Sequence, residues 1–142
     1  MVRVDVVSHK IARTTAWLND AEAILRRPRE EFLADVKERD LATFYLFLAI
    51  QECIDLAAHW VSDAGWGASE DAGSTFDVLA DRQVIDRELA GRLRNAVGLR
   101  NRIAHGYAAV DHGRLQSEFQ EGVAYLRRFL DQVASEAGLT PP

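Results

Sequence analysis

The amino-acid sequence predicts an all-α fold, a four- to five-helix up-and-down bundle in which residues 1–142 form a single domain. Two observations support this prediction. Apolar residues recur at intervals of three and four along five stretches of the chain, which is the spacing of one-sided helices, and no segment alternates convincingly as a strand does. The connections between the stretches are short, which favours antiparallel neighbours.

The first helix is expected from about Asp5 to Arg26. Its apolar positions keep the helical spacing with one polar interruption at Thr14, and they are Val4, Val7, Ile11, Leu18, Ala21 and Leu25. Pro28 breaks this helix, because proline lacks the backbone N–H that a helix interior needs. The Arg-Glu-Glu that follows Pro28 is typical of a new first helical turn, with acidic residues near the positive end of the helix dipole.

The second long helix is expected from Val36 to Ala64, and its centre, Leu41–Ile50, is apolar on nearly all sides. A buried strand is the competing interpretation, but the helical spacing continues beyond this centre without a turn signal. A helix that is apolar all round lies in the middle of a bundle or at an interface between chains. We therefore expect a homodimer. The expected core or dimer contacts are Phe44, Tyr45, Phe47 and Leu48.

Three further helices complete the predicted bundle. Ser74-Thr-Phe-Asp has the form of a capping box with Asp77 in place of Glu, and it opens a short helix that runs to about Arg82. Asp86 is expected to cap a helix that runs toward Ala104, and Asp111 is expected to cap the last helix. The last helix has the same apolar spacing at Leu115, Phe119, Val123, Leu126, Leu130 and Val133.

The composition indicates a globular protein of the cytoplasm, with 48% apolar and 27% charged residues. No secretory signal is expected, because the apolar residues near the amino terminus are interrupted by Asp5, His9 and Lys10 and form no run long enough for the apolar core of such a signal. The longest nearly apolar run is about half of what a bilayer requires, so no membrane span is expected. The single Cys53 cannot form an internal disulfide, and a reducing compartment is the simplest interpretation.

The net charge of −5 argues against a protein that coats nucleic acid such as DNA non-specifically. The distribution of the charge is uneven. Between Arg82 and Arg114 seven arginines face three acidic residues, a local balance of +4, so the remainder carries −9. A basic patch on an acidic body fits an anionic ligand bound at one site. Arginines spread around a solvated helix explain the same balance equally well.

No metal site or cofactor is expected. The four histidines stand at positions 9, 59, 105 and 112, none of them four residues from another, and Cys53 has no second cysteine near it. The chain also lacks a Gly-rich phosphate loop and a serine in a nucleophile elbow.

The segment Leu99–Tyr107 holds the most distinctive residues. On a wheel of 100° per residue, Arg100 lies in the middle of the apolar stripe of its helix, where a guanidinium is costly unless it is paired or faces a wet cleft. Glu52 or Asp55 would supply a carboxylate, so both explanations stay open. His105 lies about 140° from Arg100 on an unbroken helix, so the helix must end or distort to bring the two together; Gly106 stands where a left-handed cap is common.

Arg100 and His105 suit metal-free cleavage of RNA, although a histidine before a helix-ending glycine is more often a cap. The ribose 2′-hydroxyl is an internal nucleophile that needs a base and a cation to stabilise the charged phosphorane. Histidine, with an unperturbed pKa of about 6.5, takes the proton, and arginine presents fixed donors to phosphate oxygens. Asn101 donates to the same phosphate or holds the imidazole.

The string Arg100-Asn-Arg-Ile-Ala-His resembles the Arg-Asn-x-x-x-His signature of the HEPN superfamily. The extension His105-Gly-Tyr107 resembles its HepT-like toxin branch, of the HepT/MntA type. Looser similarity covers the helix from Tyr45 to His59 and the segments at 76–80, 84–85 and 110–111. The resemblance implies a HEPN-like helical homodimer whose two motif copies line a shared cleft.

The same resemblance implies a ribonuclease toxin of a type II/VII-like toxin-antitoxin pair, with a small nucleotidyltransferase as its antitoxin. It implies that Arg100 and His105 are catalytic, that Asn101 supports them, and that the antitoxin transfers AMP to Tyr107. A non-catalytic HEPN module that only binds a nucleotidyltransferase or a nucleotide is the alternative. The intact motif favours the nuclease.

Overall fold

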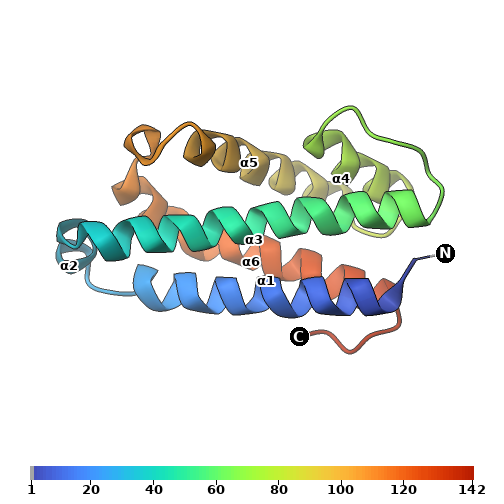
Figure 1. Cartoon of the computed structure of the whole chain (residues 1–142), viewed down its shortest axis with the longest axis horizontal. Helices are drawn as coiled ribbons and strands as arrows, with labels where there is room; N and C mark the ends of the chain where they lie inside the picture. The colour runs from blue at the N-terminus through green and yellow to red at the C-terminus, as the bar shows by residue number, and fades with distance from the viewer. Residues whose placement is uncertain (1) are drawn as a thin grey trace.

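The computed structural model describes residues 2–142, and in them the chain forms six α-helices, one 3-10 helix and no strand. Four long helices run up and down beside one another (Figure 1): α1 (Val4–Leu25), α3 (Val36–Asp63), α5 (Arg87–Ala104) and α6 (His112–Glu136). The short helices α2 (Arg29–Ala34) and α4 (Ala72–Asp81) and the 3-10 helix η1 (Tyr107–Ala109) lie in the connections. The predicted all-α bundle is confirmed.

Aspartate side chains cap most of the helices that follow a connection. The expected caps at Asp86 and Asp111 are present, each accepting a backbone N–H three residues later. The expected capping box at Ser74 is wrong. Helix α4 begins at Ala72, because the carboxylate of Asp71 accepts the N–H of Ser74 at 2.7 Å and so caps the helix three residues earlier.

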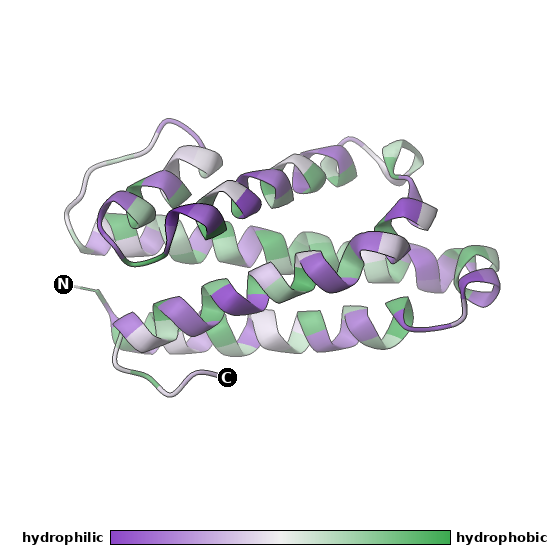
Figure 2. Cartoon of the chain, turned by 180° about the vertical axis from the view of Figure 1, so that it is seen from behind, coloured by the Kyte–Doolittle hydropathy of each residue, from purple (hydrophilic) through white to green (hydrophobic). Residues whose placement is uncertain are grey.

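The core is built from the apolar stripes that the helical spacing predicted, and Figure 2 shows hydrophobic and hydrophilic residues alternating along the long helices. Phe76 of α4 and Phe129 of α6 pack edge to face, with ring centroids 5.5 Å apart. Thr14, the polar interruption in α1, is fully buried, and its hydroxyl donates to the carbonyl of Lys10 at 2.8 Å. A buried hydroxyl is tolerated there because it has a partner.

Helix α3 is the central helix of the bundle and packs against each of the other long helices. By length and composition alone it is the one described helix apolar enough to cross a membrane, but 56% of that window is buried inside the bundle. The core helix of a soluble protein has the same composition. The absence of a membrane span stays a prediction that this burial supports.

One stripe of α3 faces outward along positions 41, 44, 48, 51 and 55, which we call the outer stripe. Leu41 is 37% exposed and Phe44 is 42% exposed, and Leu48 is half-buried. Among the residues expected as core or dimer contacts, Tyr45 and Phe47 are also half-buried, so none of the four is fully enclosed by its own chain. The stripe turns polar at Gln51 and Asp55, which lie beside the motif helix.

Candidate active site

Helix α5 carries most of the motif, and α6 anchors its start. The carboxylate of Asp86 caps α5 through the N–H of Leu89 at 2.8 Å, and it also accepts hydrogen bonds from Gln132 at 2.8 Å and Arg128 at 2.5 Å. The hydrogen bond from Gln132, with those from Leu89 and Arg128, holds the pKa of Asp86 below its ordinary value. The hydrogen bonds from Gln132 and Arg128 therefore attach the amino-terminal end of α5 to α6.

His105 lies just beyond the carboxyl end of α5, so the angle of about 140° expected on an unbroken helix does not fix its position relative to Arg100. The helix ends at Ala104, and the N–H of His105 donates to the carbonyl of Asn101 at 3.2 Å as the last turn closes. Gly106 follows with φ +128° and ψ 146°, a conformation that side-chain-bearing residues rarely adopt. The helix thus ends and does not distort. The glycine has the expected positive φ, but it is extended and not in the αL cap conformation.

Arg100 reaches from α5 to the outer stripe of α3, where its Nη1 donates to Oε1 of Gln51 at 2.8 Å. The expected carboxylate partners are wrong. Glu52 instead accepts from Lys10 at 2.9 Å in a partly buried ion pair, and Asp55 accepts from Nε2 of Gln51 at 3.2 Å. Within residues 2–142, Arg100 forms no ion pair, and its buried Nε has no hydrogen-bond partner. The Arg100 guanidinium is therefore held in place by a neutral amide and not by a carboxylate.

The other motif residues lie in reach of solvent. Asn101 and His105 are exposed, and Tyr107 is half-buried as the first residue of η1. No hydrogen bond or ion pair in the described part of the chain joins the side chains of these three residues to one another or to Arg100. The four residues thus lie on one continuous segment of the chain, but no hydrogen bond or ion pair among the described residues joins their side chains.

A charged cluster near Tyr107 was not found from the sequence. Asp40 Oδ1 lies 3.6 Å from Nε2 of His112 and 3.6 Å from Nε of Arg39. Burial raises the pKa of Tyr107, and the carboxylate of Asp40 raises it further, so the phenol is neutral at physiological pH. Burial and the charge of Arg39 lower the pKa of His112. No sequence spacing indicates this cluster, because its members come from the start of α3 and the start of α6.

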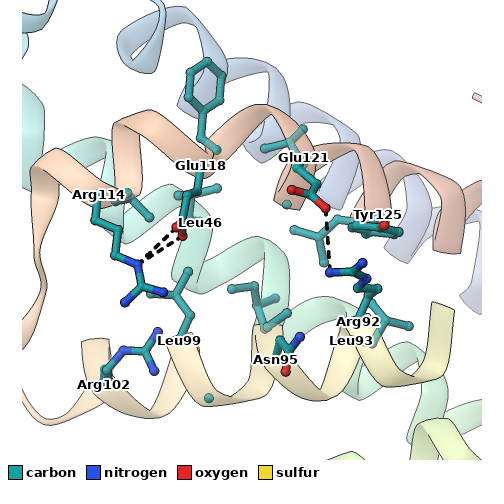
Figure 3. Close-up of a pocket in the computed structure, with 18 of the residues that line it drawn as sticks. Leu46, Arg92, Leu93, Asn95, Leu99, Arg102, Arg114, Glu118, Glu121 and Tyr125 are labelled. Atoms are coloured by element: carbon teal, nitrogen blue, oxygen red, sulfur yellow. Dashed lines mark hydrogen bonds and ion pairs between the residues drawn. The ribbon is translucent and has the colours of Figure 1, made fainter. Parts of the chain in front are cut away.

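Most arginines of the predicted basic patch are neutralised. A groove of about 830 Å³ lies between α5 and α6, and Figure 3 shows Arg92 of α5 paired with Glu121 of α6 and, within α6, Arg114 paired with Glu118. Arg102 also lines this groove and forms no ion pair among the described residues. Four of the seven arginines between 82 and 114 pair with carboxylates, and they are Arg87, Arg92, Arg94 and Arg114. The local charge therefore does not by itself define a binding surface; Arg82, Arg100 and Arg102 are the arginines of this segment that form no ion pair among the described residues.

No group of three or more His, Cys, Asp or Glu side chains within residues 2–142 is arranged to hold a metal ion.

A model of the ribonuclease HepT-like family matches residues 16–133, which is most of the chain. The chain belongs to the ribonuclease HepT-like family. The resemblance that the motif indicated is thereby confirmed, and with it the assignment of the chain as a ribonuclease-family enzyme.

Individual HepT-like relatives agree with this assignment. A protein of Archaeoglobus fulgidus named as a candidate RNase is 37% identical over 91 residues, which cover 63% of this chain and 68% of the relative. The mRNA nuclease HepT of Shewanella oneidensis is 24% identical over 132 residues, which cover 93% of this chain and 98% of that protein.

Solved structures show the same fold. A structure of the tri-AMPylated Shewanella oneidensis HEPN toxin in complex with MNT antitoxin aligns with a TM-score of 0.84 at 23% sequence identity. The alignment covers 92% of this chain and 98% of the toxin. A toxin-antitoxin structure with AMP-PNP aligns with a TM-score of 0.83 at 22% identity, covering 91% of this chain and 98% of that one.

Proposed function

We propose that this HepT-like chain is a metal-independent ribonuclease toxin that cleaves RNA through Arg100 and His105, with Asn101 in support. The observation that carries this proposal is the state of Arg100. Its guanidinium lies on a core-facing stripe, yet no carboxylate within residues 2–142 pairs with it, and a neutral amide holds it in place. A fixed and uncompensated cation suits a phosphate that gains charge during reaction.

In the proposed reaction the nucleophile belongs to the substrate. The imidazole of His105 takes the proton from the ribose 2′-hydroxyl, and the 2′-oxygen forms a bond to phosphorus. The bond from phosphorus to the 5′-oxygen breaks, and that oxygen leaves with a proton from the imidazolium or from water. Arg100 donates hydrogen bonds to the phosphate oxygens as their charge increases.

RNA cleavage is expected to persist in EDTA and to leave a 2′,3′-cyclic phosphate, because the 2′-hydroxyl attacks and no metal takes part. Incubation of the purified protein with an RNA oligonucleotide, followed by mass spectrometry of the fragments, measures both properties. An oligonucleotide with a 2′-deoxyribose at the cleaved position is the control and should stay intact. Activity that disappears with EDTA and returns with a divalent ion would show a different chemistry.

The protein is proposed to act as a homodimer whose two motif segments share one cleft. The outer stripe supports this arrangement, because exposed Leu41 and Phe44 lead along α3 to Gln51, which holds Arg100. A second chain that covers this apolar surface would lie directly beside the motif. Full burial of an exposed apolar side chain contributes about 1.5–3 kcal/mol. Leu41 and Phe44, which are 37% and 42% exposed in the single chain, would each contribute only part of that.

Light scattering at micromolar concentration is expected to give twice the chain mass of 15.9 kDa. Phe44→Asp should shift the protein toward monomer and reduce RNA cleavage, because it places a charge in the proposed interface. Val4→Asp is the matched control, since Val4 is equally exposed at 43% but lies on α1. A wild-type monomer would contradict the dimer and the shared cleft.

The proposed partner is a nucleotidyltransferase antitoxin that transfers AMP to Tyr107. The HEPN toxin structure that shares this fold is AMPylated and bound to an MNT antitoxin, and Tyr107 stands two residues after His105. A cytoplasmic location agrees with such a pair and stays a prediction.

A non-catalytic HEPN module that binds a nucleotidyltransferase or a nucleotide is the second candidate. The exposed motif side chains, which are not linked within one chain, favour it. Tight binding of that partner without any RNA cleavage by the pure dimer would identify this function.

A further inference from the structure

We propose that Gln51 is the positioning residue for Arg100, and that Asp55 fixes the orientation of the Gln51 amide. This inference rests on the proposed ribonuclease function and adds two residues outside the motif to its machinery. Three side chains form the chain of hydrogen bonds: Nη1 of Arg100 donates to Oε1 of Gln51 at 2.8 Å, and Nε2 of Gln51 donates to Oδ1 of Asp55 at 3.2 Å.

The direction of the Gln51 amide follows from both of its partners. A guanidinium only donates hydrogen bonds and a carboxylate only accepts them. The amide oxygen must therefore face Arg100 and the amide nitrogen must face Asp55. If the amide were flipped, donors would face donors and acceptors would face acceptors. Gln51 and Asp55 are one helical turn apart on α3, so the rigid helix maintains this arrangement.

The amide holds Arg100 without neutralising it. A glutamate at position 51 would form an ion pair with the guanidinium and offset the charge that the RNA phosphate needs. The neighbouring carboxylate of Glu52 does not take this role, because it is buried against Lys10 at 2.9 Å. Asp55 lies on the outer stripe but is separated from Arg100 by the Gln51 amide. Gln51 thus gives the Arg100 guanidinium a hydrogen-bond acceptor that carries no negative charge.

The position of Gln51 also places this support at the proposed cleft. Gln51 is half-buried and follows Phe44 and Leu48 along the outer stripe. A partner chain that covers the apolar part of the stripe would exclude water from the Arg100–Gln51 contact. Hydrogen bonds to a charged group are stronger where water is excluded.

Four variants test the proposal: Gln51→Met, Gln51→Glu, Arg100→Ala and the double variant Gln51→Met/Arg100→Ala. Methionine keeps the length of the side chain but loses the acceptor, and we expect kcat to fall about tenfold or more with KM changed much less. Glutamate keeps an acceptor but adds charge, and we expect KM for RNA to rise because the phosphate loses its cation. Gln120→Met, on the exposed face of α6, is the control.

The double variant separates positioning from a structural role. If Gln51 acts through Arg100, Gln51→Met should cause no further loss in the Arg100→Ala background under single-turnover conditions. Losses that multiply, or a Gln51→Met variant that cleaves as fast as wild type, would overturn the inference. Thermal unfolding of each variant is recorded beside the rates, and a kcat loss that tracks a lowered Tm would also count against positioning.

A binding measurement keeps this inference distinct from the proposed function. The affinity for an uncleavable 2′-deoxy oligonucleotide is measured for wild type, Gln51→Glu and Arg100→Ala. If wild type does not cleave RNA and both variants bind the oligonucleotide more weakly than wild type, the ribonuclease would be contradicted. The same result would support Gln51 as the neutral acceptor that leaves Arg100 without an ion-pair partner and so available to phosphate. Cleavage by wild type with equal binding and equal rates in Gln51→Glu would contradict the role of Gln51 alone.

Discussion

Arg100→Ala is expected to lower the rate of RNA cleavage by about 10²–10³-fold or more, the loss typical of removing one donor from a charged transition state. The fold should survive this change. Among the described residues the guanidinium forms a single hydrogen bond, to Gln51, and its buried Nε has no partner, so its removal leaves no buried ion unpaired there. Circular dichroism and thermal unfolding check the fold, and single-turnover kinetics with excess enzyme measure the residual rate.

His105→Ala is expected to cause a loss of about 10²–10⁴-fold, because a positioned base is worth that factor. The side chain of His105 is exposed at the end of α5, and among the described residues only its backbone N–H takes part in closing the last turn. Alanine therefore preserves the helix end. Near wild-type cleavage by His105→Ala and Arg100→Ala would place the active site elsewhere.

Arg102→Ala is the matched control for Arg100→Ala, because both residues belong to α5 and both carry one positive charge. Arg102 lines the groove between α5 and α6 (Figure 3), whereas Arg100 contacts α3. A general loss of positive charge would affect both variants, but the loss of a catalytic cation affects only one. We expect Arg102→Ala to stay within about tenfold of wild type, since an exposed charge contributes little.

The helical spacing was sufficient to predict the bundle, because the apolar residues of the long helices recur at intervals of three and four, and this spacing is local information. The caps at Asp86 and Asp111 were equally predictable. The cap of α4 was not, because both Asp71 and Ser74 are good capping residues, and the choice depends on where the preceding loop allows the helix to begin.

The motif residues were recognised from the sequence, but the partner of Arg100 was not. Periodicity places Gln51, Glu52 and Asp55 within about one turn of α3, and charge alone favours a carboxylate. The structure selects the amide, because Lys10 of α1 already pairs with Glu52 and the outer stripe turns Gln51 toward α5. Contacts between residues that are distant in the chain, such as this one and the Asp40–His112 pair, depend on how the helices dock and leave no local signal.

Tyr107 is expected to accept AMP from a cognate nucleotidyltransferase in the presence of ATP and Mg²⁺, and the modified protein should lose RNA cleavage. The phenolic oxygen forms a bond to the α-phosphorus of ATP, and pyrophosphate leaves. Burial and the Asp40 carboxylate raise the pKa of Tyr107, so the phenol is protonated at neutral pH and the transferase must supply the base that removes the proton. Peptide mapping by mass spectrometry locates the adenylate.

Inhibition follows from charge and from size. An adenylate at Tyr107 adds an anionic phosphodiester and a nucleoside two residues from His105, where the RNA phosphate is proposed to bind, so it repels and displaces the substrate. Tyr107→Phe should therefore cleave RNA at close to the wild-type rate but escape inhibition. Tyr125→Phe is the control and should remain inhibited, because Tyr125 packs against Arg92 in the groove between α5 and α6.

Two results would contradict this regulation, and each points to a different alternative. Full neutralisation of the nuclease with Tyr107 unmodified would show that the antitoxin acts by binding or modifies another residue. An inactive Tyr107→Phe with a wild-type Tm would assign the hydroxyl to catalysis, because phenylalanine preserves the ring that is half-buried in η1 and removes only one oxygen. In that case Tyr107 would join Arg100 and His105 as a group that touches the substrate.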